Sequence, residues 1–585
     1  MNWSTKPWTR PWLKATPLVG VLLLAAPANA AILPGAAVDG PSNTIDTSRP
    51  DIDVAPDNSA ALVYLKSDGG QVHPFVSRLA GGAWGAPQRV DTGSGVAASN
   101  PRIAVANGGK VVVTYLRGGD AVARISSSPG AAFGAEHIVQ AGGSQADVDM
   151  SPTGNGYAVA VSSNDIFAER LEGDTWTDVG TGALDSDQTH EAGGSNRDVR
   201  IAASPDGTGG AMAWGEALAA NTDEDVFVRR LTGTTPGAAL GTRLPPGSLP
   251  NSVGGSGKVA DQPAVDMDGA GTIWVVYRQN FEYGASVRHR AIARPITGDT
   301  VGAGQLVDNM GSAPTEGRDF QQVQVNEAGQ GLLSHHGNLT NGLEWASLAG
   351  GTWTTNGLVN PSDNGSVPQA IPALGENGSG LIAYAFKSGT GDNTAQARTT
   401  FGGLGAQTEL SNPAFGAVIG APDASAGSGA FAAAAFVQQS GNNATTNRVV
   451  AAVVDLPRPP DGPQGGGNPP PPDTTKPNVT RFRITRKVFR VGGLGTVIRW
   501  RQSEDARVTI RFARRVRGRF RTVKRKMTFQ STAGNHRLRF RGRFDLKHPL
   551  KPGRWRMTLR AKDAAGNVSA PDRVRFRLLP AVQPR

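Results

Sequence analysis

Short stretches in which apolar and polar residues alternate recur along most of the chain, each followed by a turn and a longer apolar run. The stretch SRPDIDVAPDNSAALVYLKSDGG begins at Ser48, and SNPRIAVANGGKVVVTYLRGGD begins at Ser99. SQADVDMSPTGNGYAVAVSSND, from Ser144, and NRDVRIAASPDGTGGAMAWGEA, from Asn196, repeat the pattern. The period of two, the β-branched and aromatic content and the intervening Gly, Asn and Asp predict strands joined by hairpins.

The pattern forms a long internal repeat. Its units are separated by roughly 45 to 65 residues, and their first-strand apolar anchors lie near Ile52, Ile103, Val148, Val199, Val265, Val323, Ile371 and Ile419. Units of this length with about four short strands predict the blades of a β-propeller rather than a solenoid or a series of sandwiches. Eight blades is the direct count, and seven is the alternative, depending on whether the weak unit from Phe415 to Leu456 completes a blade.

The chain divides into four segments. We expect a signal peptide over 1–30, because three basic residues precede a short apolar run and the small residues ANA. The propeller is expected over 31–456, and a stiff Pro/Gly-rich linker over 457–477. Residues 478–585 contain six or seven predicted strands, one of which alternates apolar residues with Arg or Thr from Trp555 to Ala561. The predicted fold is therefore all-β, a seven- or eight-bladed propeller followed by an immunoglobulin-like or fibronectin-like sandwich.

The leader and the composition predict where the protein works. No other stretch approaches the roughly 20 apolar residues that a membrane-spanning helix needs. The chain has no cysteine, so disulfides and thiolate chemistry are excluded. We expect an exported, extracellular, monomeric protein, with a composition typical of a high-GC bacterium and non-covalent association with the cell wall.

The net charge of +11 conceals two opposite parts. From Lys476 onward there are 32 Lys and Arg against 5 Asp and Glu, whereas the rest of the chain holds 27 basic and 43 acidic residues. The basic part predicts attraction to polyanions such as wall polymers, lipid headgroups or extracellular DNA. The candidate contacts lie in one hairpin, at Arg511, Arg514, Arg515, Arg517, Arg519, Arg521, Lys524, Arg525 and Lys526. The alternative is that these arginines only keep an exposed sheet face soluble and unpaired.

Three kinds of side chain in the repeats are candidates for a binding site. Paired acids on three first strands predict a calcium site in the channel, at Asp51, Asp53, Asp147, Asp149, Asp266 and Asp268. Arginines beside the strand starts can clamp a carboxylated sugar, and the candidates are Arg102, Arg197 and Arg200. Trp84, Trp176 and Trp353 follow Gly-rich turns and are candidates for stacking on sugar rings. The respective alternatives are turn acids, structural ion pairs and packing between blades.

Two resemblances add expectations about the families involved. PDTTKPNVTRFRIT, SEDARVTI and KPGRWRMTLRAKDAAGNVSAP resemble the immunoglobulin-like modules at the C-termini of secreted actinobacterial proteins. The repeats resemble exported sialidase-like propellers, and SPDGTGGAMAW from Ser204 approximates the box S-x-D-x-G-x-T-W, although Trp214 falls late. The sialidase resemblance implies an arginine cluster and a Tyr/Glu nucleophile pair, for which no residues of this chain can be assigned.

No established catalytic motif is present in the sequence. The chain lacks H-E-x-x-H, G-x-S-x-G and a Gly-rich phosphate loop. We therefore expect a non-enzymatic binding protein that requires no cofactor, with glycans or proteins at the propeller rim. The alternatives are a carbohydrate-active hydrolase or lyase, and an extracellular scaffold.

Overall fold

The computed structural model describes two bodies, the repeats and the basic C-terminal part. The described residues are 34–80, 82–93, 95–186, 198–219, 223–245, 259–283, 286–308, 318–337, 342–360, 369–387, 392–427, 431–440, 446–457, 476–491, 495–503, 506–531, 534–543, 550–562 and 567–580. Contacts divide the chain at Pro460, inside the segment predicted as a linker. The predicted signal peptide lies outside the described residues. In the described part of the chain, no helix has the length and apolarity needed to cross a membrane.

The first four blades are antiparallel sheets that follow one another along the chain. Blade 1 consists of β2 (Asp51–Val54), β3 (Ala60–Asp68), β4 (Gln71–Ala80), β5 (Ala83–Trp84) and β6 (Gln88–Arg89). Blade 2 consists of β7 (Ala98–Val105), β8 (Val111–Arg117), β9 (Asp120–Ser126) and β10 (His137–Gln140). Blade 3 consists of β11 (Gly143–Met150), β12 (Gly156–Ser162), β13 (Asp165–Glu172) and β14 (Thr175–Asp178). Blade 4 consists of β15 (Arg200–Ala203), β16 (Gly209–Ala219), β17 (Asp223–Thr232), β18 (Thr235–Pro236) and β19 (Leu240–Gly241).

The next four blades repeat this arrangement. Blade 5 consists of β20 (Ala260–Met267), β21 (Ile273–Tyr283), β22 (Ser286–Thr297), β23 (Thr300–Val301) and β24 (Gln305–Leu306). Blade 6 consists of β25 (Arg318–Val325), β26 (Gly331–Gly337), β27 (Gly342–Ala349) and β28 (Thr352–Asn360). Blade 7 consists of β29 (Ala370–Leu374), β30 (Gly380–Lys387), β31 (Asn393–Thr400) and β32 (Thr408–Glu409), followed by the short helix η1 (Pro413–Phe415). Blade 8 consists of β33 (Ala417–Ala426), β34 (Phe431–Gln439), β35 (Asn447–Asp455) and the N-terminal β1 (Ala36–Ser42).

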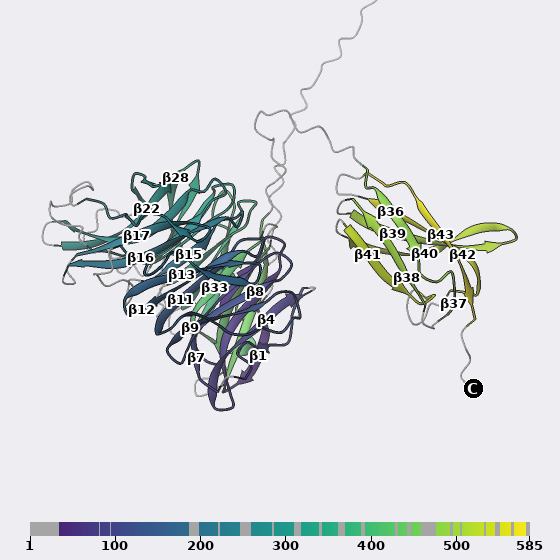
Figure 1. Cartoon of the computed structure of the whole chain (residues 1–585), viewed down its shortest axis with the longest axis horizontal. Helices are drawn as coiled ribbons and strands as arrows, with labels where there is room; N and C mark the ends of the chain where they lie inside the picture. Colours follow the sequence, from purple (N-terminus) through teal and green to yellow (C-terminus); the bar gives the residue numbers. More distant parts are fainter. Residues whose placement is uncertain are drawn as a thin grey trace, which may run out of the picture. The chain divides into compact units, whose positions relative to one another are not determined.

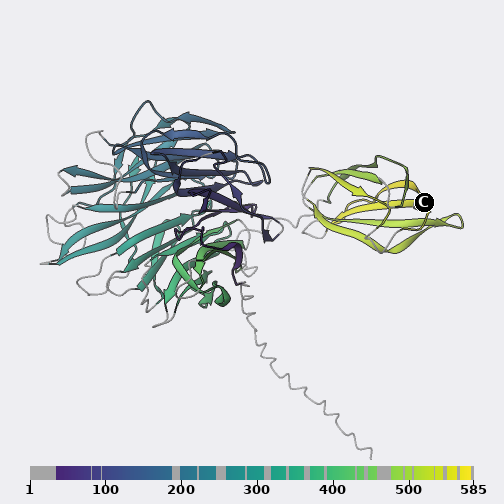
Figure 2. The same cartoon turned by 90° about the horizontal axis from the view of Figure 1, so that it is seen from below.

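The strand β1 closes the propeller. It pairs antiparallel with β35, with Ala36 opposite Ala451 and Ala37 opposite Val450. Purple β1 therefore lies beside the green strands of the last blade (Figures 1 and 2). Each first strand contacts the first strand of the next blade, and β33 contacts β2. Among the described residues the propeller thus has eight blades, and the weak unit from Phe415 to Leu456 is completed by a strand from the other end of the chain.

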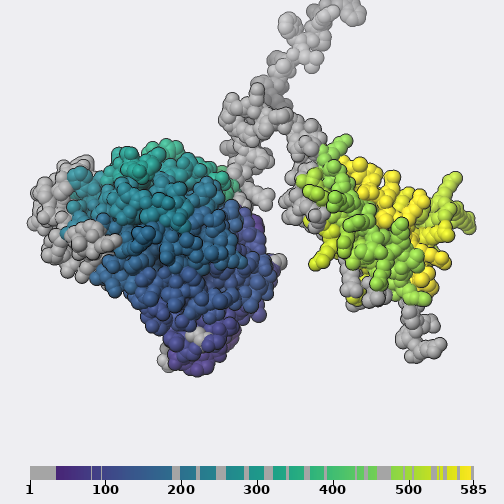
Figure 3. Space-filling model, in the orientation of Figure 1, coloured from purple at the N-terminus to yellow at the C-terminus, as the bar shows by residue number. Residues whose placement is uncertain are grey.

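The hydrophobic core of the propeller lies between the blades. Eight core clusters each combine residues of two neighbouring blades, and together they complete the ring, the last joining blade 8 to blade 1. Burial against a neighbour on each face explains the apolar second strands, such as β12, in which every residue is buried. In the space-filling view, the purple to teal blades pack into a continuous surface (Figure 3).

The hairpin turns after the first strands share one conformation, which explains the recurring turn letters. In blades 1 to 7 a residue with positive φ donates its N–H to the carbonyl oxygen of the residue three positions earlier. Asn58 donates to Ala55 in this way, and Gly154 donates to Ser151. The φ of Gly154 is 86° and that of Asn58 is 65°, a left-handed region that Gly and Asn tolerate.

The C-terminal part is a two-sheet sandwich with its own core. One sheet contains β36 (Val479–Ile484), β38 (Thr496–Gln502) and β41 (Gly534–Phe540). The other contains β37 (Val488–Arg490), β43 (Asp572–Leu579), β42 (Gly553–Lys562), β39 (Ala506–Val516) and β40 (Arg519–Ser531), and it is mixed because β37 runs parallel to β43. A single cluster with Trp500, Phe512 and Trp555 joins the two sheets.

Candidate functional site

The first strand of each blade faces the central channel, and its acidic side chains reach across to the next blade. In β2, one carboxylate oxygen of Asp51 accepts the Ile103 N–H at 2.7 Å, and one of Asp53 accepts the Val105 N–H at 2.6 Å. Ile103 and Val105 belong to the first strand of blade 2. The acids therefore join neighbouring first strands, which otherwise share no ladder of hydrogen bonds.

The same bond recurs around the channel, and it accounts for most of the acids predicted as calcium ligands. The carboxylates of Asp147, Asp149 and Asp266 accept the backbone N–H groups of Ile201 (3.2 Å), Ala203 (2.7 Å) and Val325 (2.6 Å). Asp268 differs, because it accepts the N–H groups of Ala270 and Thr272 in its own hairpin turn.

The acids do not gather around a common point. Among the described residues, no group of three or more His, Asp or Glu side chains is close enough together to hold a metal ion. Calcium binding in the channel stays a prediction.

Burial changes the protonation of these carboxyl groups. It raises the pKa of Asp53 and raises that of Asp149 well above its ordinary value, although backbone N–H groups act in the opposite direction. Burial also raises the pKa of Asp266 to about 7, and that of Asp423 in blade 8 to about 7.

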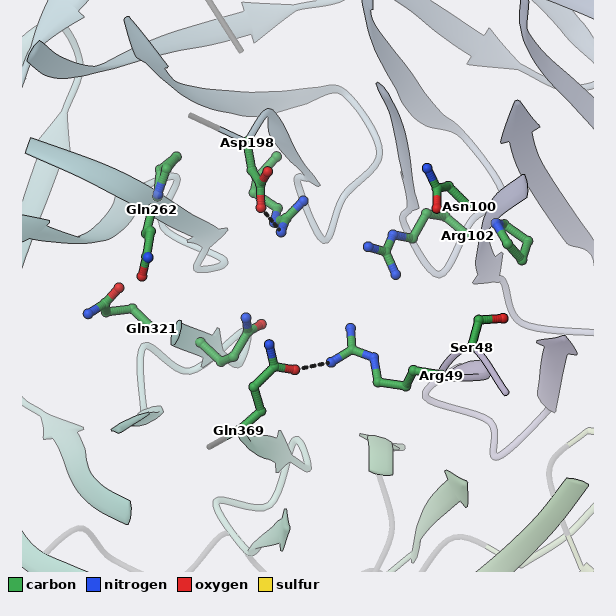
Figure 4. Close-up of a pocket in the computed structure, with 12 residues that line it drawn as sticks. Ser48, Arg49, Asn100, Arg102, Asp198, Gln262, Gln321 and Gln369 are labelled. Atoms are coloured by element: carbon green, nitrogen blue, oxygen red, sulfur yellow. Dashed lines mark hydrogen bonds and ion pairs between the residues drawn. The ribbon is translucent and has the colours of Figure 1, made fainter. Parts of the chain in front are cut away.

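One mouth of the channel is an open cavity of about 510 Å³, which we call the arginine mouth. Residues from six blades line it: Ser48, Arg49, Asn100, Pro101, Arg102, Asp198, Arg200, Gln262, Pro263, Gln321, Gln322 and Gln369. The labelled side chains surround a shared central space, into which Arg49, Arg102 and Gln369 extend (Figure 4). Three guanidinium groups and five side-chain amides therefore converge on one cavity, with Asp198 as the only carboxylate lining it among the described residues.

Each of the three arginines has a polar partner at the mouth. Arg102 lies 3.5 Å from Asp51, Arg200 lies 2.8 Å from Asp198, and Arg49 donates to the Gln369 amide oxygen at 3.1 Å. The side chains of Arg102 and Arg200 keep 30% and 28% of their area exposed. Burial lowers the pKa of Arg49, and the nearby Arg102 and Arg200 charges lower it further, whereas the Asp423 and Asp51 carboxylates act in the opposite direction. Burial acts to lower the pKa of Arg102, but the charges of Asp51, Asp147, Asp423 and Asp198 raise it above its ordinary value. Carboxylates therefore balance the cluster on the channel side, while Arg102 and Arg200 stay partly exposed at the mouth.

The channel is electrostatically polarised along its length. Below the arginine mouth, a cavity of about 220 Å³ is lined by the three arginines and by five acids: Asp51, Asp53, Asp147, Asp149 and Asp423. The opposite mouth, about 280 Å³, is lined by acids and no basic side chain among the described residues: Asp53, Asp149, Asp266, Glu327 and Glu376. The basic side chains of the channel therefore lie toward one mouth, and the other mouth is lined by acids alone among its described charged residues.

The predicted tryptophans lie between blades and do not line the arginine mouth. Trp353 is 6% exposed and meets Trp274 edge-on at 5.8 Å between ring centroids. Trp176 stacks on His137 at 5.6 Å, and Trp84 packs against the core cluster between blades 8 and 1. This packing is the alternative that the sequence left open. Of the three predicted arginines, Arg102 and Arg200 are brought together, and Arg197 lies outside the described residues.

The nine predicted polyanion contacts lie on β39, β40 and their turn. All are exposed except Arg514, which is half-buried and donates to the Pro552 carbonyl at 2.8 Å. The sequence therefore located a strongly cationic surface, although the arrangement of its charges becomes visible only with the strand register.

Sequence reasoning missed Arg49, Asp423 and the amide side chains of the arginine mouth. Arg49 precedes Asp51 by two positions, so the period of two places it toward the same side of the strand. Asp423 accepts the Ile52 N–H at 2.8 Å and is the counterpart of Asp51 in blade 8. The sequence pattern did not reveal this role, because the apolar anchor of the unit was predicted at Ile419. The strand has a register shift between Ile419 and Asp423, so the residues facing the channel come later than the anchor indicates.

Comparisons with known proteins give remote structural similarity and no family. No family model matches the sequence, and no curated protein matches it. Among solved structures, the Dos1 propeller matches at 6% identity and TM-score 0.41, over 74% of this chain and 96% of that one. An ulvan lyase of polysaccharide lyase family PL25 matches at 10% identity and TM-score 0.38, over 72% and 95%. The BP39L lectin from Burkholderia pseudomallei matches at 12% identity and TM-score 0.36, over 63% and 100%. At these values the similarities carry no functional argument.

Proposed function

We propose that this chain is an exported, non-enzymatic recognition protein whose arginine mouth binds a carboxylate-bearing sugar, and whose basic sandwich tethers it to anionic surface polymers. The observation that carries the proposal is the convergence of Arg49, Arg102 and Arg200 with five amides on one cavity. Guanidinium groups bind carboxylates through paired, charge-assisted hydrogen bonds. Amides both donate to and accept from sugar hydroxyls.

The composition of the cavity favours binding over hydrolysis. Glycoside hydrolysis requires two carboxyl groups on either side of the scissile bond. The described lining of the arginine mouth offers Asp198 alone, and Arg200 engages it. The channel acids below carry backbone hydrogen bonds to the next blade, which hold them away from an acid–base role.

Calorimetry with glucuronate, galacturonate and the matching neutral sugars tests the mouth. We expect the uronates to bind and the neutral sugars to bind at least 10-fold more weakly. Arg200→Ala should weaken uronate binding about 10- to 100-fold, because it removes a charge-assisted pair. Arg102→Lys keeps the positive charge but lacks the planar guanidinium with its paired N–H donors, so we expect a smaller loss of uronate affinity.

Arg230→Ala is the matched control, because Arg230 lies on the third strand of blade 4 and does not line the cavity. Equal binding of uronates and neutral sugars, or equal losses in Arg200→Ala and Arg230→Ala, would contradict the proposal. Mass spectrometry of longer glycans after incubation distinguishes the enzyme, because new cleavage products would indicate a hydrolase or lyase. A chain that neither retains nor cleaves any glycan would point to a scaffold.

A further inference from the structure

The three-stranded sheet of the sandwich presents a row of like charges on its outer face. Arg483 on β36 lies directly opposite Arg499 on β38, and Arg499 lies directly opposite Arg537 on β41. All three are exposed, whereas the neighbouring residues Ile498 and Trp500 point into the core. We call this row the three-strand face.

The five-stranded sheet carries a second cationic face on the other side of the core. Arg554 lies opposite Arg577, and Arg556 opposite Arg575, on adjacent strands β42 and β43. The guanidinium groups of Arg556 and Arg575 lie 5.0 and 5.6 Å from the centre of the Phe520 ring. The five-strand face consists of Arg507, Arg511, Arg554, Arg556, Arg560, Arg573, Arg575 and Arg577.

These pairs oppose folding unless an anion neutralises them. Like charges directly opposite each other on a sheet are destabilising. Asp572 is the one carboxylate among the described residues of the sandwich, and its side chain accepts the N–H of Arg573 rather than a guanidinium of either face. The buried Nε of Arg556 has no hydrogen-bond partner. Scattered charges are enough to keep a sheet face soluble. Arginines placed directly opposite each other on both sheets therefore indicate a ligand whose negative charges offset their repulsion.

We propose that each face binds its own segment of a linear anionic polymer, so that one sandwich bridges two polymer chains. Guanidinium groups about 5 Å apart across strands and about 7 Å apart along a strand suit a polymer with one anion in each repeat unit. Phosphodiester-linked and uronic acid polymers share this chemistry. The sheets lie about 10 Å apart, so a short oligomer covers one face only. This inference rests on the tether role proposed above and adds that the tether is bivalent.

Two sets of triple variants separate the faces at equal net charge. Arg483→Gln, Arg499→Gln and Arg537→Gln remove the row of the three-strand face. Arg554→Gln, Arg575→Gln and Arg577→Gln remove three of the eight arginines of the five-strand face and break both of its directly opposed pairs. A third set, Arg486→Gln, Lys487→Gln and Lys551→Gln, removes three exposed charges that lie outside both faces and outside the β39–β40 hairpin, and it serves as the control. Each set relieves or leaves unchanged the like-charge repulsion, so folding should survive, and thermal unfolding checks it.

The full chain carrying Arg200→Ala is used, so that the arginine mouth does not contribute. Calorimetry with short oligogalacturonate and short polyphosphate measures stoichiometry, and light scattering with the long polymers measures bridging. We expect two oligomers per chain and strong scattering for the parent and for the control set. Each face variant should bind one oligomer and lose the scattering.

A parent that binds one oligomer, or face variants that scatter like the parent, would overturn bridging while leaving the tether intact. A parent that binds neither polymer would overturn the tether itself. Scattering with long DNA but with neither of the other polymers would assign the faces to nucleic acid instead. A difference between the polyphosphate and uronate arms identifies which anion the faces prefer.

Discussion

At the scale of single residues, the channel acids join neighbouring blades by accepting backbone hydrogen bonds from the next first strand. The carboxylate of Asp266 accepts the N–H of Val325 at 2.6 Å and that of its own neighbour Met267 at 2.7 Å. A buried carboxylate is costly unless such bonds compensate. For Asp266 burial still prevails, since its pKa rises to about 7. The same side chain therefore joins two blades and makes the junction sensitive to pH.

This shift predicts how stability depends on pH. Because the folded-state pKa of Asp266 lies above its unfolded value, the folded state holds the proton more tightly, and stability is lost as pH rises from about 4 to about 7. The loss from one such group approaches about 1.4 kcal/mol per pH unit in that window. Asp266→Asn cannot ionise, so urea unfolding of this variant should decline less between pH 5 and pH 8 than that of the parent.

Asp299→Asn is the control, because Asp299 is exposed in the turn between β22 and β23. Its pH profile should match that of the parent. If Asp266→Asn retains the full pH slope, burial does not govern this carboxyl group, and other channel acids must account for the dependence.

At the scale of elements, the sequence was sufficient for the strands, the hairpins and the repeat. Period-two alternation and the Gly and Asn turns specify these features locally, and eight units were countable. The exact phase of a unit was harder to predict, because apolar residues flank the anchor on both sides. In blade 4 the residue that pairs with Asp147 is Ile201, two positions after the predicted Val199.

The candidate site was predictable only in part. Arg102 and Arg200 sit on first strands, so strand position alone suggested them. Gln262, Gln321 and Gln369 meet them only because six blades converge on one mouth, a consequence of ring closure that no local pattern contains. The position of Trp353 was also not predictable, because a tryptophan after a Gly-rich turn can lie either at the rim or in the core. In the structure it lies in the core, packed against blade 5.

Ring closure predicts a particular dependence on β1. This strand covers the outer edge of β35, and its Asp39 binds Lys66 of blade 1 at 2.8 Å and also accepts from the Tyr64 hydroxyl. Deleting 34–42 should expose the edge of β35 and separate blade 8 from blade 1. We expect a lower and broader thermal transition and increased light scattering on heating.

Asp39→Asn is the milder variant, because it keeps the strand and weakens only the contact to blade 1. It should lower the free energy of unfolding by about 1 to 3 kcal/mol without promoting aggregation. A deletion variant with the thermal midpoint of the parent would show that the ring does not depend on β1.

At the scale of the whole molecule, the two bodies divide the chemistry between them. The propeller holds a cavity of about 510 Å³ lined by three arginines, which we propose for one sugar unit, whereas the sandwich holds extended cationic faces, which we propose for a polymer. The acidic balance before Lys476 and the basic balance after it follow this division. Because each body has a core of its own, each should remain folded when the chain between them is cut.

This independence gives the last prediction. A protease site inserted at 461–470 should yield two folded fragments, the propeller retaining uronate binding and the sandwich retaining polyanion binding. On a surface that displays both ligands, the intact chain should dissociate at least 10-fold more slowly than either fragment, because the first contact raises the effective concentration for the second. Salt should release the sandwich fragment steeply, since its contacts are ionic. Equal dissociation of the intact and cut proteins would show that the two sites act on separate targets, and the tether would then serve only to place the propeller near the surface.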